Sequence, residues 1–306
     1  HTFSGAITNN STTGGLNLSA LTSGGTTTFS GVISGGGAVI TEGAGTVILS
    51  GASQNTWTST LTANGTLLVL NKWAETRAIG TGNMTIATGA TVRTDANNQL
   101  GTGTPSLITI NGTGIFNLNN TNQKIALASA SSTASVTLGS GTFNIDNTGT
   151  DTYAGTISGS GAVTKTNTGI EILTNTTNNY TGATTITAGE IRLQPSANAT
   201  FASQIVLNGG TLGTTGITAT RTWTSSSTLN LGASSTIALA SATAHTLTFA
   251  ASNGVSWSSP AMIRITGWSG SYNGTTGTGG KIFIGSTATG LTSSQLNQIV
   301  FFNGTN

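Results

Sequence analysis

Thr152–Gln194 reads TYAGTISGSGAVTKTNTGIEILTNTTNNYTGATTITAGEIRLQ and contains short runs in which apolar and polar residues alternate. The runs at Gly169–Leu173, Thr184–Ile186 and Glu190–Leu193 have the length of β-strands, and Gly, Asn, Ser and Thr separate them. The pattern recurs in Thr28–Leu70, where TFSGVISG corresponds to TYAGTISG of the first stretch. An internal repeat of this kind predicts a repetitive fold, because each unit buries its apolar face against its neighbours.

A shorter unit of strand, glycine-containing hinge and strand recurs along the chain, at Met84–Val92, Ile108–Phe116, Val136–Phe143, Ile205–Leu212 and Leu229–Ile237. The hinges follow one another at intervals of roughly 20–27 residues, which is typical of a β-solenoid. Strands of a β-sandwich would recur every 8–12 residues or so without a longer period. The sequence therefore predicts an all-β fold, a parallel β-helix over residues 1–260 with coils of roughly 20–27 residues.

The composition supports an ordered β protein with a nearly ion-free surface. Charged residues are 5% of the chain and hydrophobic residues 35%, whereas disordered chains combine low hydrophobicity with high net charge. The 3 Pro residues in 306 suit a chain that needs its backbone N–H groups for strand pairing. The outward positions carry Thr, Ser and Asn, and Thr favours strands because it is β-branched.

Several classes of protein are disfavoured by the same numbers. There is no Cys, so a disulfide framework is excluded. The net charge is +2 with no run of like charges, which argues against a nucleic-acid partner. No apolar run reaches the roughly 18 residues of a membrane helix, so we expect no transmembrane segment.

Residues 261–306 do not follow the sequence pattern of the repeats. Met262–Trp268 reads as a strand, followed by a Gly/Thr-rich loop at Ser269–Gly280 and a strand at Lys281–Gly285. Leu291–Ile299 predicts a short helix, because Thr292 and Gln295 have the spacing of a capping box, and a final strand follows. We expect a small C-terminal strand–helix–strand element that is cap-like or joins subunits.

The repeat at Thr152–Gln194 resembles the autotransporter-associated β-strand repeat of bacterial surface proteins. The residues that carry the resemblance are Gly169–Leu173, Asn179–Ile186 and Ala188–Leu193. The copy at Gly45–Leu70 follows the pattern more loosely, with Trp57 where Tyr is usual. The resemblance implies a right-handed parallel β-helix, export across the envelope and a secreted or cell-surface location. It implies no single activity, because such passengers range from adhesins to stalks.

The residues that could carry catalysis are dispersed. The seven acids are Glu42, Glu75, Asp95, Asp146, Asp151, Glu171 and Glu190. We interpret them as solvated edge or turn residues, which discourage aggregation between sheet edges. His245 lies in a strand and is predicted to point outward. No His/Asp cluster suggests a metal ligand set, so the sequence predicts neither an enzyme nor a cofactor.

Two groups of residues interrupt the polar, uncharged surface. Lys72–Arg77, with the sequence KWAETR, is predicted to project from the stack as a loop or short helix. The five Trp residues could form a sugar-stacking strip, but their spacing favours packing in the core or at corners. They are Trp57, Trp73, Trp223, Trp257 and Trp268.

The most specific functional expectation concerns the two ends of the predicted stack. An uncapped β-helix exposes a strand edge at each end, and such edges can pair head to tail. The candidate assembly edges are Phe3, Ile7, Ile299, Val300, Phe301 and Phe302. We therefore expect a non-enzymatic extracellular structural protein, a surface stalk, adhesin or fibre subunit, whose partners are other copies of itself, other cell-surface components or glycans.

Two alternatives remain open at this stage. One is a protein that binds or degrades polysaccharide, which would require acids or Trp residues from separate coils to converge in one groove. The other is an ice-binding β-solenoid, which would require a regular, flat array of Thr side chains.

Overall fold

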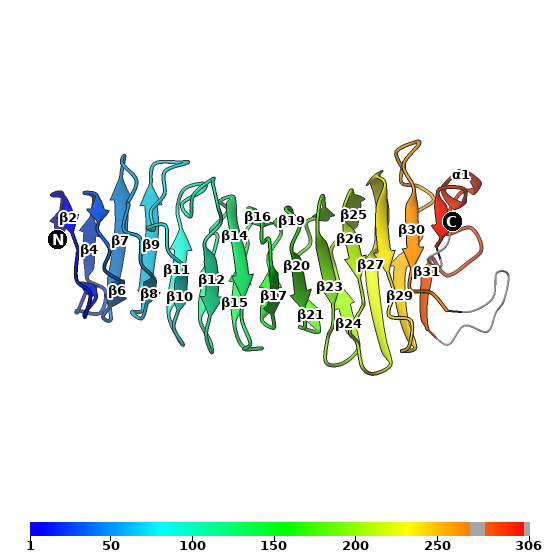
Figure 1. Ribbon diagram of the computed structural model, residues 1–306, viewed down its shortest axis with the longest axis horizontal. Helices are drawn as coiled ribbons and strands as arrows, with labels where there is room; N and C mark the ends of the chain where they lie inside the picture. The colour runs from blue at the N-terminus through cyan, green and yellow to red at the C-terminus, as the bar shows by residue number, and fades with distance from the viewer. Residues whose placement is uncertain (270–278, 303–306) are drawn as a thin grey trace. The chain divides into compact units, whose positions relative to one another are not determined.

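The computed structural model describes residues 1–269 and 279–302, and these are almost entirely parallel β-strands stacked as coils of a β-solenoid. The parallel β-helical architecture predicted from the repeat is thus confirmed. The chain divides into two compact units, which are described separately. The first comprises His1–Asn147 and Tyr153–Gly161, and the second Thr148–Thr152 and Ala162–Asn306. Figure 1 labels the strands in chain order.

In the first unit, two long faces of the solenoid are parallel sheets. One face contains β1 (Thr2–Phe3), β4 (Thr26–Phe29), β7 (Thr46–Gly51), β9 (Leu67–Lys72), β11 (Thr91–Thr94), β13 (Ile115–Asn117), β15 (Ser135–Thr137) and β18 (Thr156–Ser158). The other contains β3 (Leu16–Ser19), β6 (Val39–Glu42), β8 (Leu61–Ala63), β10 (Met84–Ile86), β12 (Leu107–Ile110), β14 (Gln123–Ala128) and β16 (Thr142–Ile145). The short strands β2 (Ile7–Thr8) and β5 (Ile33–Ser34) pair between the two faces.

The register of these strands places like residues above one another. Phe3 is opposite Phe29, which is opposite Leu49, which is opposite Leu70. Leu49 and Leu70 are completely buried. Because side chains alternate between the two faces of a strand, each inward position forms an apolar column along the interior. These columns are the core of the unit.

Buried amide side chains bond the backbone at the corners of the first unit. The Asn55 side chain accepts a hydrogen bond from the Ile33 amide at 2.8 Å and donates one to the Ala78 carbonyl. Gln99 accepts from the Lys72 amide, and Gln123 accepts from the Gln99 amide at 2.9 Å. Such bonds satisfy corner backbone groups that no strand pairs with.

The second unit has the same construction. One face contains β20 (Ile170–Leu173), β23 (Glu190–Leu193), β26 (Thr211–Gly213), β28 (Ser235–Ala238), β30 (Ile263–Thr266) and β32 (Ile299–Phe301). The other strands are β19 (Ala162–Lys165), β22 (Thr184–Ile186), β25 (Ile205–Asn208), β21 (Thr177–Asn178), β24 (Ala199–Phe201), β27 (Arg221–Ala233), β29 (His245–Ala250) and β31 (Gly280–Ile284). β17 (Thr150–Tyr153) neighbours β20.

Tyr180, from the repeat motif, is a core residue of this second unit. Its side chain is 1% exposed, and its hydroxyl lies 2.6 Å from the Thr184 hydroxyl. The Thr184 hydroxyl in turn lies 2.8 Å from that of Ser203. Burial raises the pKa of Tyr180, while these hydrogen bonds lower it. The chain of hydroxyls lets a polar aromatic ring occupy the interior without an unpaired oxygen.

The C-terminal strand–helix–strand element is confirmed. α1 (Ser293–Leu296) begins at the N-cap Thr292, whose side chain accepts from the Gln295 amide while the Gln295 side chain accepts from the Thr292 amide. This is the capping box that the sequence predicts, although the helix is shorter than Leu291–Ile299. The loop expected at Ser269–Gly280 lies mostly outside the described residues.

Candidate functional site

The core of the first unit is uncovered at its N-terminal coil. Phe3 belongs to the same inward column as Phe29 and stacks on it, with ring centroids 5.3 Å apart and planes inclined by 12°. Phe3 is nevertheless 52% exposed, whereas Phe29 is 8% exposed. Ile7 likewise lies opposite the buried Ile33 and is itself half-buried. Within the described residues, β1 pairs only with β4, so its other edge is open.

The core of the second unit is uncovered at its last coil. The inward column there consists of Leu212, Ile237, Ile265 and Phe301. Ile265 is 2% exposed, but Phe301 is 56% exposed although the Trp268 ring contacts it edge-on, with centroids 5.5 Å apart. Val300, on the outer side of β32, is also exposed. β32 pairs only with β30 in the part of the chain that the structure describes.

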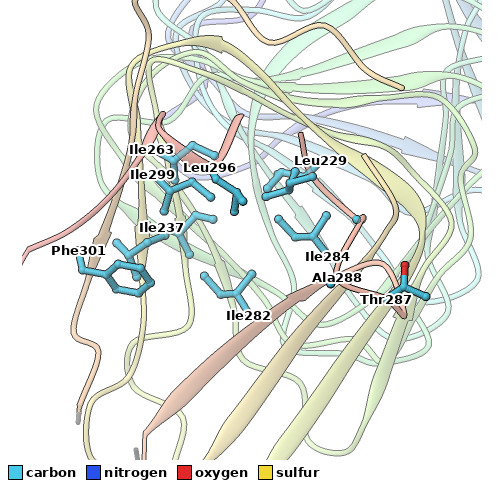
Figure 2. A pocket seen from close by; sticks show the side chains of 13 residues that line it. Leu229, Ile237, Ile263, Ile282, Ile284, Thr287, Ala288, Leu296, Ile299 and Phe301 are labelled. Atoms are coloured by element: carbon cyan, nitrogen blue, oxygen red, sulfur yellow. The ribbon is translucent and has the colours of Figure 1, made fainter. Parts of the chain in front are cut away.

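An apolar cavity of about 330 Å³ lies at this last coil. Figure 2 shows the side chains that line it, which come from β27, β28, β30, β31, α1 and β32. The lining is aliphatic apart from Phe301 and Thr287, and comprises Leu229, Ile237, Ile263, Ile265, Ile282, Ile284, Thr287, Ala288, Gly290, Leu291, Leu296, Ile299 and Phe301. A cavity with one hydroxyl and no titratable group suits an apolar side chain and offers no acid–base chemistry.

The six predicted edge residues lie in two coils, Phe3 and Ile7 in one and the other four in the other. Phe3 and Ile7 lie in the first coil of the first unit, and Ile299 and Phe301 line the cavity of the second. The remaining two, Val300 and Phe302, lie beside Arg264, which is opposite Val300 and places its guanidinium 4.2 Å from the centre of the Phe302 ring.

The acids do not all lie at solvated edges, and the interpretation of Glu171 and Asp146 was wrong. Glu171 points inward from β20 and is completely buried. Burial raises its pKa well above the usual value, Asp151 raises it further, and Lys165 lowers it. Asp146 is 5% exposed and forms a salt bridge of 2.9 Å with Lys124.

Two basic side chains are also placed differently from the prediction. Lys72 does not project from the stack: it is 1% exposed and donates to the Ser50 carbonyl at 2.7 Å. Burial lowers its pKa to about 8. His245 is 3% exposed and not outward; its Nδ1 lies 2.7 Å from the Thr243 carbonyl and its Nε2 2.8 Å from the Thr214 hydroxyl. Burial lowers the pKa of His245, although the bond to Thr243 opposes this.

The strand pattern itself contains the signal for these buried charges. Glu171 alternates with Leu173, Lys165 with Val163, and His245 with Leu247, so each shares an inward position with an apolar residue. Because charged residues are rarely buried, these side chains were predicted to be solvated even though the alternation of the strand places them inward. The apolar cavity has no comparable signal, because it depends on how the last coil closes.

The Trp residues mostly pack in the core, as predicted. Trp57, Trp223 and Trp257 are buried, while Trp73 is 69% exposed. The buried position of Trp57 resembles that of Tyr180, its counterpart in the repeat. The side chains thus form no exposed strip of the kind that stacks on sugars among the residues described.

Comparison with known proteins leaves the family undetermined. No family model, curated protein or solved structure matches this chain. Over residues 1–269 and 279–302, three or more His, Cys, Asp or Glu side chains do not gather where they could hold a metal ion. Among those same residues, no helix is long and apolar enough to cross a membrane.

Proposed function

We propose that this chain is a non-enzymatic extracellular structural protein of the bacterial surface, a β-solenoid whose two uncovered core ends join successive copies end to end. The observation that supports this most is the exposure of inward core residues at the end coils. Phe3 and Phe301 are each more than half exposed, although their columns are buried one coil further in. The resemblance of the repeat to autotransporter passengers supports the surface location.

The strand directions also support end-to-end pairing. All the named pairs within each unit are parallel, so the open edge of β1 in the first unit and the open edge of β32 in the second can each accept a further parallel strand. A strand can add to such an edge through backbone hydrogen bonds. The contact is heterologous and does not close on itself, which gives fibres. Burial of the two Phe side chains would add about 1.5–3 kcal/mol each.

Light scattering and electron microscopy of the 306-residue chain test this proposal. We expect particle mass to rise with concentration and end-to-end fibres to form. Phe301→Asp and Phe3→Asp should each abolish the rise, because a carboxylate in the contact would be buried without a partner. Trp73→Asp is the matched control: Trp73 is 69% exposed and directly follows β9, so it belongs to neither end coil and assembly should persist. A protein that stays monomeric at all concentrations would contradict the proposal.

One observation favours the ice-binding alternative as a second candidate. Thr177, Thr200, Thr224 and Thr248 lie opposite one another on consecutive strands of the second unit. Their side chains point outward, and the first three are exposed. Strand spacing sets these hydroxyls about 4.8 Å apart in a row. Thermal hysteresis that is lost in Thr224→Lys would support this function, and its absence at high protein concentration would exclude it.

A further inference from the structure

The chain contains six Asn–Gly pairs, of which four lie within the residues that the structure describes. These four begin at Asn64, Asn111, Asn208 and Asn253, and each of these Asn residues is exposed. An Asn–Gly pair can rearrange, because Gly has no Cβ to keep its backbone nitrogen away from the side-chain carbonyl of Asn. The reaction needs that nitrogen free and the pair able to bend, so the structure distinguishes the four pairs.

Asn253 and Gly254 form the middle of a turn between β29 and β30. The Val255 amide donates to the Ser252 carbonyl at 3.0 Å and closes the turn, while both central residues are exposed. No described residue accepts a hydrogen bond from the Gly254 amide. A Cβ on Gly254 would meet no atom within 4 Å, so there is open space around the pair.

The two ends of this turn are held by hydrogen bonds, and its middle is not. The Ser252 amide donates to the Gly290 carbonyl at 2.8 Å. The Gln295 side chain donates to the Ser252 carbonyl at 2.9 Å and to the Val255 carbonyl at 2.8 Å. Local freedom is therefore concentrated in the two residues between these carbonyls.

The pair that begins at Asn208 is the most protected of the four. The Gly209 amide donates to the Ser235 hydroxyl at 2.8 Å, so the nitrogen that would react is already bonded. Asn208 is also the last residue of β25. This pair must break a hydrogen bond before it can rearrange.

The remaining two described pairs have less room than Asn253. Gly65 lies against the backbone of Glu42. Gly112 lies against the Thr88 side chain and has a φ of 51°. Close packing resists the bending that brings the Gly nitrogen onto the Asn side chain.

We propose that Asn253 is a site of spontaneous deamidation. The backbone nitrogen of Gly254 bonds to Cγ of Asn253 and gives up its proton to water or hydroxide. The C–N bond of the side-chain amide breaks, and its nitrogen takes up a proton and leaves as ammonia. Water then adds to either carbonyl of the resulting cyclic imide and opens it to aspartate or isoaspartate. The net reaction consumes one water and releases one ammonia.

The products change both the charge and the main chain of this turn. A carboxylate replaces a neutral side chain, which lowers the net charge of +2 by one. Isoaspartate also inserts one carbon atom into the main chain between the Ser252 and Val255 carbonyls. Because the Gln295 side chain bonds both carbonyls, this insertion should break one of the two bonds and loosen α1.

Site-resolved mass spectrometry of the 306-residue chain during incubation at mildly alkaline pH tests the proposal. We expect the peptide that contains Asn253 to gain the mass of an amide-to-acid exchange, as both aspartate and isoaspartate. The reaction should be about tenfold faster there than at Asn208, where a hydrogen bond must first break. The amide hydrogens of α1 should exchange faster in the isoaspartate form than in fresh protein. Unchanged exchange would overturn the loosening of α1.

Gly254→Val is the matched variant. A branched side chain beside the nitrogen hinders closure of the imide ring, while the open space around Gly254 accommodates it and the φ there is outside the left-handed region. The variant should fold as the wild type does, which circular dichroism checks, and should lose most of the deamidation at Asn253. An undiminished rate in the folded variant would overturn the proposal.

Ser235→Ala tests the protecting hydrogen bond from the other side. It frees the Gly209 amide and should therefore speed the reaction at Asn208. The wild-type measurement decides the proposal even if this variant fails to fold. Deamidation at any other described Asn–Gly pair that is faster than at Asn253, or an Asn253 that stays an amide throughout, would overturn it.

Discussion

Lys72 in the first unit and Lys165 in the second are both buried lysines at the end of a strand, and both donate to backbone carbonyls. They differ in what faces them. Burial alone lowers the pKa of Lys72 to about 8. Lys165 instead lowers the pKa of Glu171, and the hydrogen bond from the Ile170 amide to the Gly149 carbonyl places Asp151 opposite Glu171. The comparison shows that a lysine bonded to corner carbonyls either has a pKa lowered by burial, as Lys72 does, or lies where acids oppose its charge, as Lys165 does.

The largest effect should come from removing the compensated lysine. Lys165→Met leaves the buried Glu171 and the half-buried Asp151 without the positive charge, which should lower the free energy of unfolding by about 3 kcal/mol. Urea denaturation followed by circular dichroism measures it. Arg93→Met, which breaks the salt bridge of two partly exposed side chains with Asp95, is the control and should cost less than about 1 kcal/mol. Equal costs for the two variants would show that the buried cluster has no special energetic role.

Lys72 should make the stability of the protein depend on alkaline pH. Its pKa is about 8 when folded and higher when unfolded, so between these values the unfolded chain binds more protons. Stability should therefore rise from pH 8 to pH 10 by about 2 kcal/mol, and this rise should be missing in Lys72→Met. Urea midpoints over that range measure the difference. Parallel curves for the two proteins would contradict the lowered pKa of Lys72.

His245 should give a smaller effect at acid pH. Burial lowers its folded pKa below the unfolded value of about 6.5, so the unfolded chain takes up the proton first as pH falls. The stability that the neutral His245 contributes is present above about pH 6.5 and is lost as the pH falls below it. Wild-type stability should fall by about 1 kcal/mol more than that of His245→Leu between pH 7 and pH 5. An identical decline in both would indicate that the imidazole is hydrated.

The smallest effect should come from two ion pairs between partly exposed side chains, one in each unit. Arg93 bonds both carboxylate oxygens of Asp95 at 2.7 Å, and Arg192 bonds both oxygens of Glu190 at 2.7 and 2.9 Å. Asp95→Asn and Glu190→Gln should each cost about 0.5 kcal/mol, and less in high salt. Thermal unfolding with and without salt checks this. A cost comparable to that of Lys165→Met would remove the contrast between buried and surface charges.

Much of the fold was predictable because strand length, alternation and period all depend on local sequence. The runs at Thr184–Ile186 and Glu190–Leu193 are β22 and β23 with the predicted bounds. The candidate site was predictable in part, since Phe3 and Phe301 mark the first and last strands. The inward positions of Lys165 and Glu171 were missed because charged residues are expected at the surface. Whether a buried charge has an opposite charge nearby depends on residues one coil away. The volume of the end cavity depends on packing that no local pattern encodes.

The separation between opposite residues has a consequence for how such a chain can change in length. Ile115 on β13 is opposite Ser135 on β15, 20 positions later, and Ile115 is also opposite Thr91 on β11. Excising residues 115–134 would bring Ser135 against Thr91 and Val136 against Val92, so the inward residues of this face would still point inward. A gene can therefore lengthen or shorten this face of the protein by duplicating or losing about twenty codons, one coil at a time.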